Sequence, residues 1–390
     1  AEVGRHDLAR ISRAAAAVVS PGIPPEAAPV AAARGAGLEV VAESELGLRC
    51  LPNTRILAIT GTNGKTTTTA LTAHLLVSGG LRAASAGNIG RPLSAVALED
   101  APPDWLAVEL SSFQLHDMPG LSPAAGVLTN LAPDHLDRYA SLADYYADKA
   151  QLFRNATAAS IWITNGDDTE VRRMMVDIPG MHRQFSTVRV ADGWYDRDGG
   201  QLMLGRAPLL PRRDLLLLGD HNVANALAAA LAAWVADVPM AALAAGLRSF
   251  RALPHRLEPV REVDGVLWIN DSKATNIAST EVALAALDRP YVLLLGGRHK
   301  GEPYTRLAPL LAGGCRAVIA YGEAGPLVLA DLAGSVRVVE GGSFDDVLGK
   351  AKRLARPGDA VLLSPACSSY DMFRNYEERG ARFRAAAEAF

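Results

Sequence analysis

The sequence predicts an α/β protein built around mostly parallel β-sheets, and three features of the 390-residue chain support this fold class. Short runs rich in leucine and β-branched residues alternate with longer amphipathic segments, which is the pattern of βα units around a parallel sheet. A glycine-rich loop at residues 61–67 joins a predicted strand to a predicted helix. A second series of βα units follows a predicted hairpin at residues 256–270.

The composition excludes several classes of protein. The chain is 49% hydrophobic and 21% charged, and its length suggests two or three domains with buried cores. A formal net charge of -3 argues against nucleic acid as the main partner. Three cysteines are too few for a disulfide scaffold and fit a reducing compartment, so we expect a cytoplasmic protein. We expect neither a secretory signal nor a membrane span, because the apolar region 224–247 is broken by Asp237 and Pro239.

The predicted elements follow one another in the order expected of two α/β domains. In the first part of the chain we expect strands at residues 55–60, 105–110, 126–129 and 161–164, and helices at 66–77, 142–155 and 222–234. After the hairpin, whose turn is Asp264-Gly265, we expect strands at 291–297, 317–321, 336–340 and 359–364. Domain boundaries are predicted near residues 44–52 and 252–254, and the first forty or so residues are too short for a domain of their own.

The glycine-rich loop is the strongest local signal of function. It consists of Gly61, Thr62, Asn63, Gly64, Lys65, Thr66 and Thr67. Glycines at a helix N-terminus let backbone N–H groups cradle phosphate, Lys65 would reach the β- and γ-phosphates, and Thr66 would ligate magnesium. The loop is shorter than a full Walker A motif, which has a glycine where Ile59 stands. A glycine-rich turn with a helix-capping threonine is the alternative, but the strand before and the helix after favour binding of a nucleoside triphosphate.

Two further candidates lie at consecutive predicted strand ends downstream of this loop, and a third is on the helix that follows. Glu109 ends the second strand, His135 follows the third beside Asp134 and Asp137, and Lys149 is on the next helix. Ligands of open parallel sheets bind outside the carboxyl ends of the strands, where a carboxylate is well placed for magnesium. Taken singly, Glu109 could be a helix cap or an ion-pair partner, and His135 could be structural. Their shared position favours one site.

The motifs GTNGKT, GNIG at residues 87–90, ELSSFQL at 109–115 and DHLDR at 134–138 together resemble the Mur ligases, ATP-dependent amide ligases of bacterial cell-wall assembly. Later motifs are similar to those of the family members that add D-glutamate to UDP-N-acetylmuramoyl-L-alanine. These are HNVANALAA from His221, LPHR at 253–256, INDSKATN at 269–276, LLLGGRHKG at 293–301 and LLSPACSSYDMFRNYEERG at 362–380. The likeness extends from about residue 20 to residue 390.

The resemblance implies a catalytic centre with ATP and two magnesium ions. Lys65 would bind the γ-phosphate, Thr66 and Glu109 would hold the first magnesium, and His135 would serve the second. Lys149 matches the family lysine that becomes carbamylated. An ammonium group is repelled by divalent cations, whereas a carbamate is an anion that can ligate them. The sequence is one residue shorter between His135 and Lys149 than in some members.

The resemblance also implies three groups of binding residues. The nucleotide would be contacted by Asn222, Asn225, Arg256 and Asp271, and the UDP-sugar by Ser20, Asn88, Ser111 and Gln114. D-glutamate would be held by Lys273, Thr275, Lys300, Ser369 and Tyr376, the last of which is Phe in some members. For Lys273 and Lys300 the alternative is a solvated charged face. Cys367 is expected to be a small buried residue, and His6, His74, His116 and His182 to be surface or packing residues.

The family architecture implies three domains in this chain. Residues 1–45 would be the remainder of an N-terminal Rossmann-like UDP-binding domain, 46–252 a central ATP-binding domain of the P-loop type, and 253–390 a C-terminal Rossmann-like domain that binds the amino acid. The family's glycine-rich βα unit would precede Ala1. It is either outside the given sequence or absent from the protein, and UDP-sugar binding should be weak if the protein lacks it. The implied partners are small-molecule substrates alone, with no nucleic acid or membrane, and the implied state is a monomer.

Three other functions were weighed. Folylpolyglutamate synthetase shares the phosphate loop and the catalytic logic, but the DSKATN and SPACSS motifs are not expected of it. A P-loop ATPase or nucleotide-binding regulator would turn over ATP without any amine acceptor. A non-catalytic scaffold is disfavoured because Lys65, Glu109, His135 and Lys149 are all present.

Overall fold

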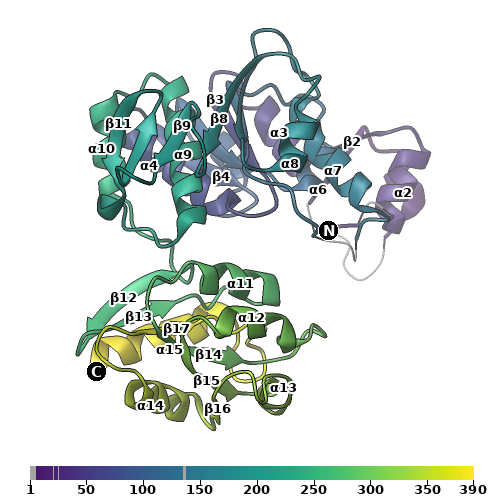
Figure 1. Cartoon of the computed structure of the whole chain (residues 1–390). Helices are drawn as coiled ribbons and strands as arrows, with labels where there is room; N and C mark the ends of the chain where they lie inside the picture. The colour runs from purple at the N-terminus through teal and green to yellow at the C-terminus, as the bar shows by residue number, and fades with distance from the viewer. Residues whose placement is uncertain (1–5, 21, 25, 135–137) are drawn as a thin grey trace. The chain divides into compact units, whose positions relative to one another are not determined.

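The computed structural model describes the chain except for residues 1–5, 21, 25 and 135–137 (Figure 1). The described residues form two compact units. The first unit runs to Leu215 and includes His221–Phe250, and the second comprises Leu216–Asp220 and Arg251–Phe390. His135, predicted to serve a magnesium ion, lies outside the described residues.

Nine of the described strands form the sheet of the first unit, in the order β11-β10-β9-β8-β7-β6-β3-β5-β4. The neighbours from β4 to β9 pair in parallel, whereas β9, β10 and β11 pair antiparallel. The strands are β3 (Arg55–Thr60), β4 (Ala83–Gly87), β5 (Trp105–Glu109), β6 (Ala125–Leu128), β7 (Ile161–Asn165), β8 (Met181–Ser186), β9 (Gly193–Asp196), β10 (Gln201–Leu204) and β11 (Ala207–Pro211). The central strands β3, β5 and β6 are buried almost throughout, as is usual for parallel strands covered on both faces.

Seven helices lie between or after these strands in the described part of the first unit. They are α4 (Lys65–Ser78), α5 (Leu93–Ala97), α6 (Ser112–His116), α7 (Leu142–Ala150), α8 (Thr169–Met174), α9 (Asp220–Val235) and α10 (Met240–Ser249). Helix α9 is rich in alanine, and its small side chains are buried from Ala226 to Ala233. It ends at Val235, and α10 starts directly after Pro239, so the apolar region 224–247 forms two helices as predicted. No helix of the described chain has the length and apolar character needed to span a membrane.

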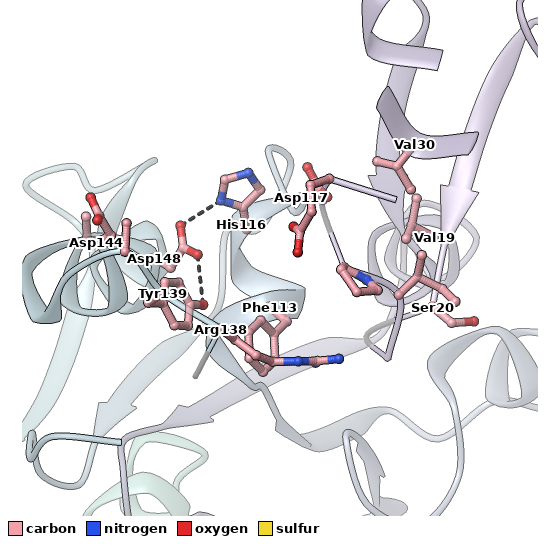
Figure 2. Close-up of a pocket in the computed structure, with 15 residues that line it drawn as sticks. Val19, Ser20, Val30, Phe113, His116, Asp117, Arg138, Tyr139, Asp144 and Asp148 are labelled. Carbon is pink, nitrogen blue, oxygen red and sulfur yellow. Dashed lines mark hydrogen bonds and ion pairs between the residues drawn. The ribbon is translucent and has the colours of Figure 1, made fainter. Parts of the chain in front are cut away.

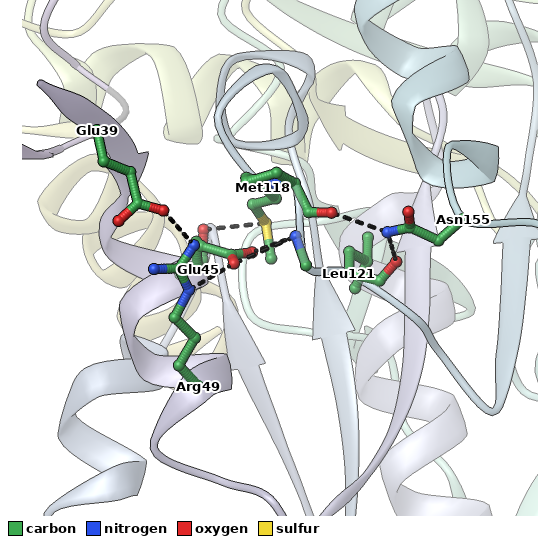
Figure 3. A network of polar contacts seen from close by, with 9 residues as sticks. Glu39, Glu45, Arg49, Met118, Leu121 and Asn155 are labelled. Atoms are coloured by element: carbon green, nitrogen blue, oxygen red, sulfur yellow. Dashed lines mark hydrogen bonds and ion pairs between the residues drawn. The ribbon is translucent and has the colours of Figure 1, made fainter. Parts of the chain in front are cut away.

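The N-terminal part of the first unit adds a small sheet. Strands β1 (Ala16–Val19) and β2 (Glu39–Ala42) pair in parallel, and the helices around them are α1 (Leu8–Ile11), α2 (Ala28–Gly35) and α3 (Glu43–Arg49). A polar network fixes α3 to the loop that follows α6 (Figure 3). Glu45 is fully buried and accepts hydrogen bonds from Arg49 Nε at 2.8 Å and from the Gly120 backbone N–H at 3.2 Å. Asn155 holds the same loop by donating to the carbonyl oxygens of Pro119 and Leu121.

Replacing Glu45 with leucine is expected to destabilise the protein by about 1–3 kcal/mol, because the Gly120 N–H and the Arg49 guanidinium lose the buried carboxylate that accepts their hydrogen bonds. Glu45→Gln is the matched control, since its amide oxygen can still accept that bond. Urea unfolding followed by circular dichroism measures both free energies. Equal stability of the leucine variant and the wild type would show that this network does not hold the loop.

Six of the described strands form the sheet of the second unit, in the order β12-β13-β17-β14-β15-β16. They are β12 (Glu258–Val263), β13 (Val266–Asn270), β14 (Tyr291–Gly296), β15 (Cys315–Tyr321), β16 (Val338–Glu340) and β17 (Ala360–Leu363). The β12–β13 pair is antiparallel, and the other neighbours in this order pair in parallel. The helices are α11 (Ile277–Ala285), α12 (Ala308–Leu311), α13 (Gly325–Asp331), α14 (Phe344–Leu354) and α15 (Tyr376–Ala389). Alternate residues of β14 enter two separate apolar clusters, Leu293 one of them and Leu294 the other, so both faces of the sheet are covered.

The predicted α/β fold class with mostly parallel sheets is confirmed. The hairpin is confirmed as β12 and β13, joined by a turn in which Asp264 and Gly265 both have positive φ. Most predicted strands and helices agree with the structure to within a few residues, although the helix expected at 142–155 ends at Ala150 and continues as a short 3₁₀ turn. Strands β2, β4 and β8 to β11 were not predicted.

Candidate active site

The predicted phosphate loop, residues 61–67, joins β3 to the first turn of α4, and its two glycines allow close packing. Gly61 and Gly64 have φ of 143° and 81°, a region that favours glycine. A Cβ on Gly61 would lie 2.0 Å from Thr129 Oγ1, and one on Gly64 would lie 2.3 Å from Asn225 Oδ1. The end of β6 also supports the loop, because Asn130 accepts hydrogen bonds from the N–H groups of Thr62 and Asn63. Sequence reasoning did not single out Asn130, although it directly follows a predicted strand.

Two lysine side chains converge on one carbonyl of this loop. Lys65 Nζ donates to the carbonyl oxygens of Gly61 at 2.9 Å and Thr62 at 2.8 Å. Lys149 Nζ, from the last turn of α7, donates to the same Gly61 oxygen at 2.8 Å. Lys149 is 1% exposed and its Nζ lies 4.7 Å from the centre of the Tyr145 ring. Burial, aided by the charge of Lys65, lowers the pKa of Lys149 to about 7, so a large fraction of this amine is neutral at neutral pH.

Glu109 has the character of a metal ligand. It ends β5, is 2% exposed, and accepts a hydrogen bond from Asn88 Nδ2 through Oε1 at 3.0 Å. Its Oε2 is buried and makes no hydrogen bond within the described part of the chain. Such an oxygen is a suitable ligand for Mg²⁺, which commonly binds one or two carboxylates together with substrate phosphates and water. Among the described residues, which exclude His135, no three His, Cys, Asp or Glu side chains form a metal-binding group.

The predicted nucleotide-binding residues fall on both units. Asn222 and Asn225 are buried in the first turns of α9 and bonded to each other at 3.0 Å. Asn225 also accepts a bond from Thr68 of α4 at 3.3 Å, so this pair lies beside the phosphate loop. Asp271 and Arg256 belong to the second unit. Asp271 accepts hydrogen bonds from the Ser364 hydroxyl and from the Leu257 N–H. Burial raises the pKa of Asp271 to about 7.

No set of contacts in this structure joins all four of the described residues that were predicted to bind the UDP-sugar. Asn88 is bonded to Glu109, whereas Ser111 and Gln114 bond to each other as the capping box at the start of α6. Ser20 lines a cavity of about 340 Å³ whose opposite wall is formed by α6 and α7 (Figure 2). Phe113 and Tyr139 are stacked in that wall, with ring centres 5.4 Å apart.

The predicted D-glutamate residues form two contact pairs in the second unit. Lys273 Nζ donates to the Tyr376 hydroxyl at 3.1 Å and lies 4.9 Å from the centre of its ring. Lys300 Nζ lies 3.4 Å from Thr275 Oγ1 and is exposed, whereas Lys273 is half-buried. Ser369 is buried.

Arg379 links the segments that carry these residues, and sequence reasoning missed it. Its guanidinium is fully buried and donates to Ser272 Oγ, to the Ser272 carbonyl and to the Cys367 carbonyl. Ser272 Oγ in turn donates to the Tyr376 carbonyl at 2.8 Å. The one available signal was an arginine in the NYEERG motif next to Tyr376. Cys367 is fully buried as expected, 2.8 Å from the Tyr304 hydroxyl.

His116 has a polar partner that the sequence did not indicate. His116 was interpreted as a surface or packing residue, but its Nδ1 lies 2.7 Å from Asp148 Oδ1 (Figure 2). The hydrogen bond to Asp148 is the main reason why the pKa of His116 is raised. The side chain is 42% exposed, in keeping with the expected surface position, and its partner is on another helix, 32 residues along the chain.

Comparison with known proteins identifies the family. The sequence matches the Mur ligase middle domain over residues 59–233 and the Mur ligase glutamate ligase domain over residues 255–367. The chain belongs to the Mur ligase family. It is 41% identical over 394 residues to the UDP-N-acetylmuramoylalanine–D-glutamate ligase of Salinibacter ruber, covering 95% of this chain and 84% of the relative. The enzyme of the same name from Myxococcus xanthus is 42% identical over 384 residues, with the same coverage.

Solved structures show the same fold at low sequence identity. The structure of a UDP-N-acetylmuramoyl-L-alanyl-D-glutamate–2,6-diaminopimelate ligase matches with a TM-score of 0.65 and 20% identity, covering 97% of this chain and 93% of that one. A MurF ligase from Thermotoga maritima in complex with ADP matches with a TM-score of 0.66 and 16% identity, covering 97% and 96%.

Proposed function

We propose that the protein joins D-glutamate to UDP-N-acetylmuramoyl-L-alanine in an ATP-dependent, ADP-forming reaction of peptidoglycan precursor synthesis. The relatives that are about 40% identical over nearly the whole chain carry the name of this activity. The observation in the structure that carries the proposal is the phosphate loop with two lysine nitrogens on its Gly61 carbonyl. Mass spectrometry of the reaction products tests it, because a dipeptide product must gain the mass of one glutamate less one water.

The chemistry explains why a phosphate-binding site is needed. An ionised carboxylate is a poor electrophile, so transfer of the γ-phosphoryl group of ATP to the alanyl carboxylate first forms an acyl phosphate. The amine of D-glutamate attacks the acyl carbon, a tetrahedral intermediate forms, and phosphate leaves. Lys65 would exchange its loop carbonyls for the β- and γ-phosphate oxygens and stabilise the charge on the transferring group. The loop from Gly61 to Thr67 would hold the phosphates through its backbone N–H groups and the N-terminus of α4.

A second part of the proposal concerns two magnesium ions. Thr66 and Glu109 would hold one magnesium ion, and His135 with a carbamate on Lys149 would hold a second. When bound, the ions neutralise the like charges of the carboxylate and the triphosphate. The unbonded Oε2 of Glu109 fits the first role. The low pKa of Lys149 fits the second, because carbamate forms from a neutral amine.

The second unit would bind the amino acid. Lys273 and Lys300 would pair with the carboxylates of D-glutamate, while Thr275, Ser369 and Tyr376 would donate hydrogen bonds. The contact between Lys273 and the Tyr376 hydroxyl supports a shared pocket, and Arg379 would hold the segments that form it. Catalysis requires the amine held here to reach the acyl phosphate formed at the first unit.

The remaining assignments rest on the family. The nucleotide would contact Asn222, Asn225, Arg256 and Asp271, and the UDP-sugar would contact Ser20, Asn88, Ser111 and Gln114. We propose the limits 1–45, 46–252 and 253–390 for the UDP-binding part, the ATP-binding domain and the amino-acid-binding domain. We also propose a cytoplasmic monomer whose partners are its small-molecule substrates.

Replacing Lys273 with alanine is expected to raise the KM for D-glutamate at least about tenfold and to change the KM for ATP less than about twofold, because one charge-assisted contact to the amino acid is lost. The matched control is Lys352→Ala, which removes another lysine that lies over an aromatic ring in the same unit. Steady-state kinetics with each substrate varied in turn measures both constants. Equal changes in the two constants would contradict a role of Lys273 in the amino-acid pocket.

A further inference from the structure

A polar contact between α6 and α7 lies directly beside Lys149 and has no role in the reaction described above. His116 ends α6, and Asp148 immediately precedes Lys149 in α7. Asp148 Oδ1 accepts from His116 Nδ1 at 2.7 Å, and Asp148 Oδ2 accepts from the Tyr139 hydroxyl at 2.9 Å (Figure 2). Both oxygens of this carboxylate are therefore occupied. We call His116, Tyr139 and Asp148 the α6–α7 clamp.

The clamp is continuous with the surroundings of Lys149. The Tyr139 ring is stacked on Phe113 of α6 and lies 5.3 Å from the Tyr145 ring, measured between centres. The Tyr145 hydroxyl lies 3.3 Å from Thr62 Oγ1 in the phosphate loop, and Lys149 Nζ lies over the Tyr145 ring. An unbroken set of contacts thus joins His116 to the phosphate loop.

Helix geometry explains how the clamp acts on Lys149. Successive residues of an α-helix are separated by about 100° around its axis, because one turn takes 3.6 residues. Asp148 contacts α6, and Lys149, one residue later, contacts the Gly61 carbonyl. Fixing the direction of Asp148 therefore fixes the rotation of the last turn of α7, and with it the direction of Lys149. A misplacement of about 1 Å in a reacting group can lower a rate about a hundredfold.

We propose that His116 and Tyr139 are positioning residues, which hold both oxygens of Asp148 and so direct the Lys149 nitrogen toward the phosphate loop. This inference rests on the proposed function, in which Lys149 acts at the phosphoryl-transfer centre. It assigns no contact with substrate to His116, Tyr139 or Asp148.

The test compares His116→Ala, Tyr139→Phe, Asp148→Asn and the double variant His116→Ala/Asp148→Asn. We expect each single variant to lower kcat about tenfold and to leave the KM for ATP within about twofold, because Lys149 is misdirected while the nucleotide site is intact. The double variant should lose no more than the worse single variant, since both changes break one unit. His116→Gln can still donate to Asp148 and should recover most of the activity. His182→Ala is the matched control, because this histidine bonds a backbone carbonyl of its own segment.

A second readout separates positioning from general loss of structure. The ¹³C NMR signal of a lysine carbamate formed with ¹³CO₂ should be weaker in the clamp variants than in the wild type and in His182→Ala at the same CO₂ concentration. Tyr139→Phe keeps the stacked ring and loses only the hydroxyl. If His116→Ala does not fold, the kcat of Tyr139→Phe therefore tests the positioning role. An unchanged kcat in Tyr139→Phe and Asp148→Asn would overturn the inference. A wild-type enzyme without D-glutamate-dependent turnover would instead overturn the proposed function.

Discussion

Replacing Lys65 with alanine is expected to lower ATP-dependent phosphate release at least about a thousandfold, to background level. The Lys65 nitrogen lies within the phosphate loop, bonded to the carbonyl oxygens of Gly61 and Thr62. Groups that stabilise the charge of a transferring phosphoryl act mainly in the transition state, so the loss should appear in kcat. A coupled assay of phosphate release with all three substrates present measures it.

A control is needed for the loss of one positive charge. Lys350→Ala removes a lysine that pairs with Asp346 on the second unit, and its turnover should equal that of the wild type. Circular dichroism should show both variants folded. Turnover of Lys65→Ala within about threefold of the wild type would refute the assignment of the loop as the phosphate site.

Replacing Lys149 with alanine is expected to lower kcat at least about a hundredfold. Added formate or acetate should restore part of the activity, because a small carboxylate can occupy the space left by the buried side chain and replace the carbamate. Lys149→Arg is the matched control. It keeps a positive charge, leaves no space for an added acid and forms no carbamate, so it should be inactive and should not respond to added acids.

The same assignment predicts a dependence on pH. Because burial and Lys65 lower the pKa of Lys149 to about 7, the neutral amine is abundant above pH 7 and falls about tenfold per unit below it. The activity of the wild-type enzyme, measured at low CO₂, should therefore fall as the pH is lowered below 7, together with the fraction of neutral amine. If Lys149→Ala retains full activity without added acids, the carbamate assignment is wrong.

The part of the candidate site on the first unit could be predicted from the sequence, because its residues lie in one continuous segment or at the end of a predicted strand. The phosphate loop is one continuous segment between a strand and a helix, and Glu109 follows from the rule that ligands meet at the carboxyl ends of parallel strands. The resemblance to the Mur ligases supplied the role of Lys149 and the residues of the second unit, which no local pattern indicates. The roles assigned to all these residues, the loop at 61–67 and Glu109 included, stay predictions.

Contacts between distant segments could not be predicted. The bond between His116 and Asp148 depends on the packing of α6 against α7. The burial of Arg379 depends on the segments after β13 and β17, which carry Ser272 and Cys367. The capping box of Ser111 and Gln114 is a local pattern, but the family resemblance drew attention to substrate contacts instead. Strands β9 to β11 are four or five residues long, and burial alternates strictly only in β10, so their pairing depends on neighbours rather than on their own sequence.

Phosphate release from ATP in the presence of UDP-N-acetylmuramoyl-L-alanine is the most direct test of the proposed activity. D-glutamate, L-glutamate, L-lysine and no amino acid are compared under otherwise identical conditions. The proposed ligase releases phosphate rapidly with D-glutamate and at background rate in the other three reactions. Release that is equally fast without any amino acid would contradict the account, because it would show an ATPase in which no amine completes the reaction.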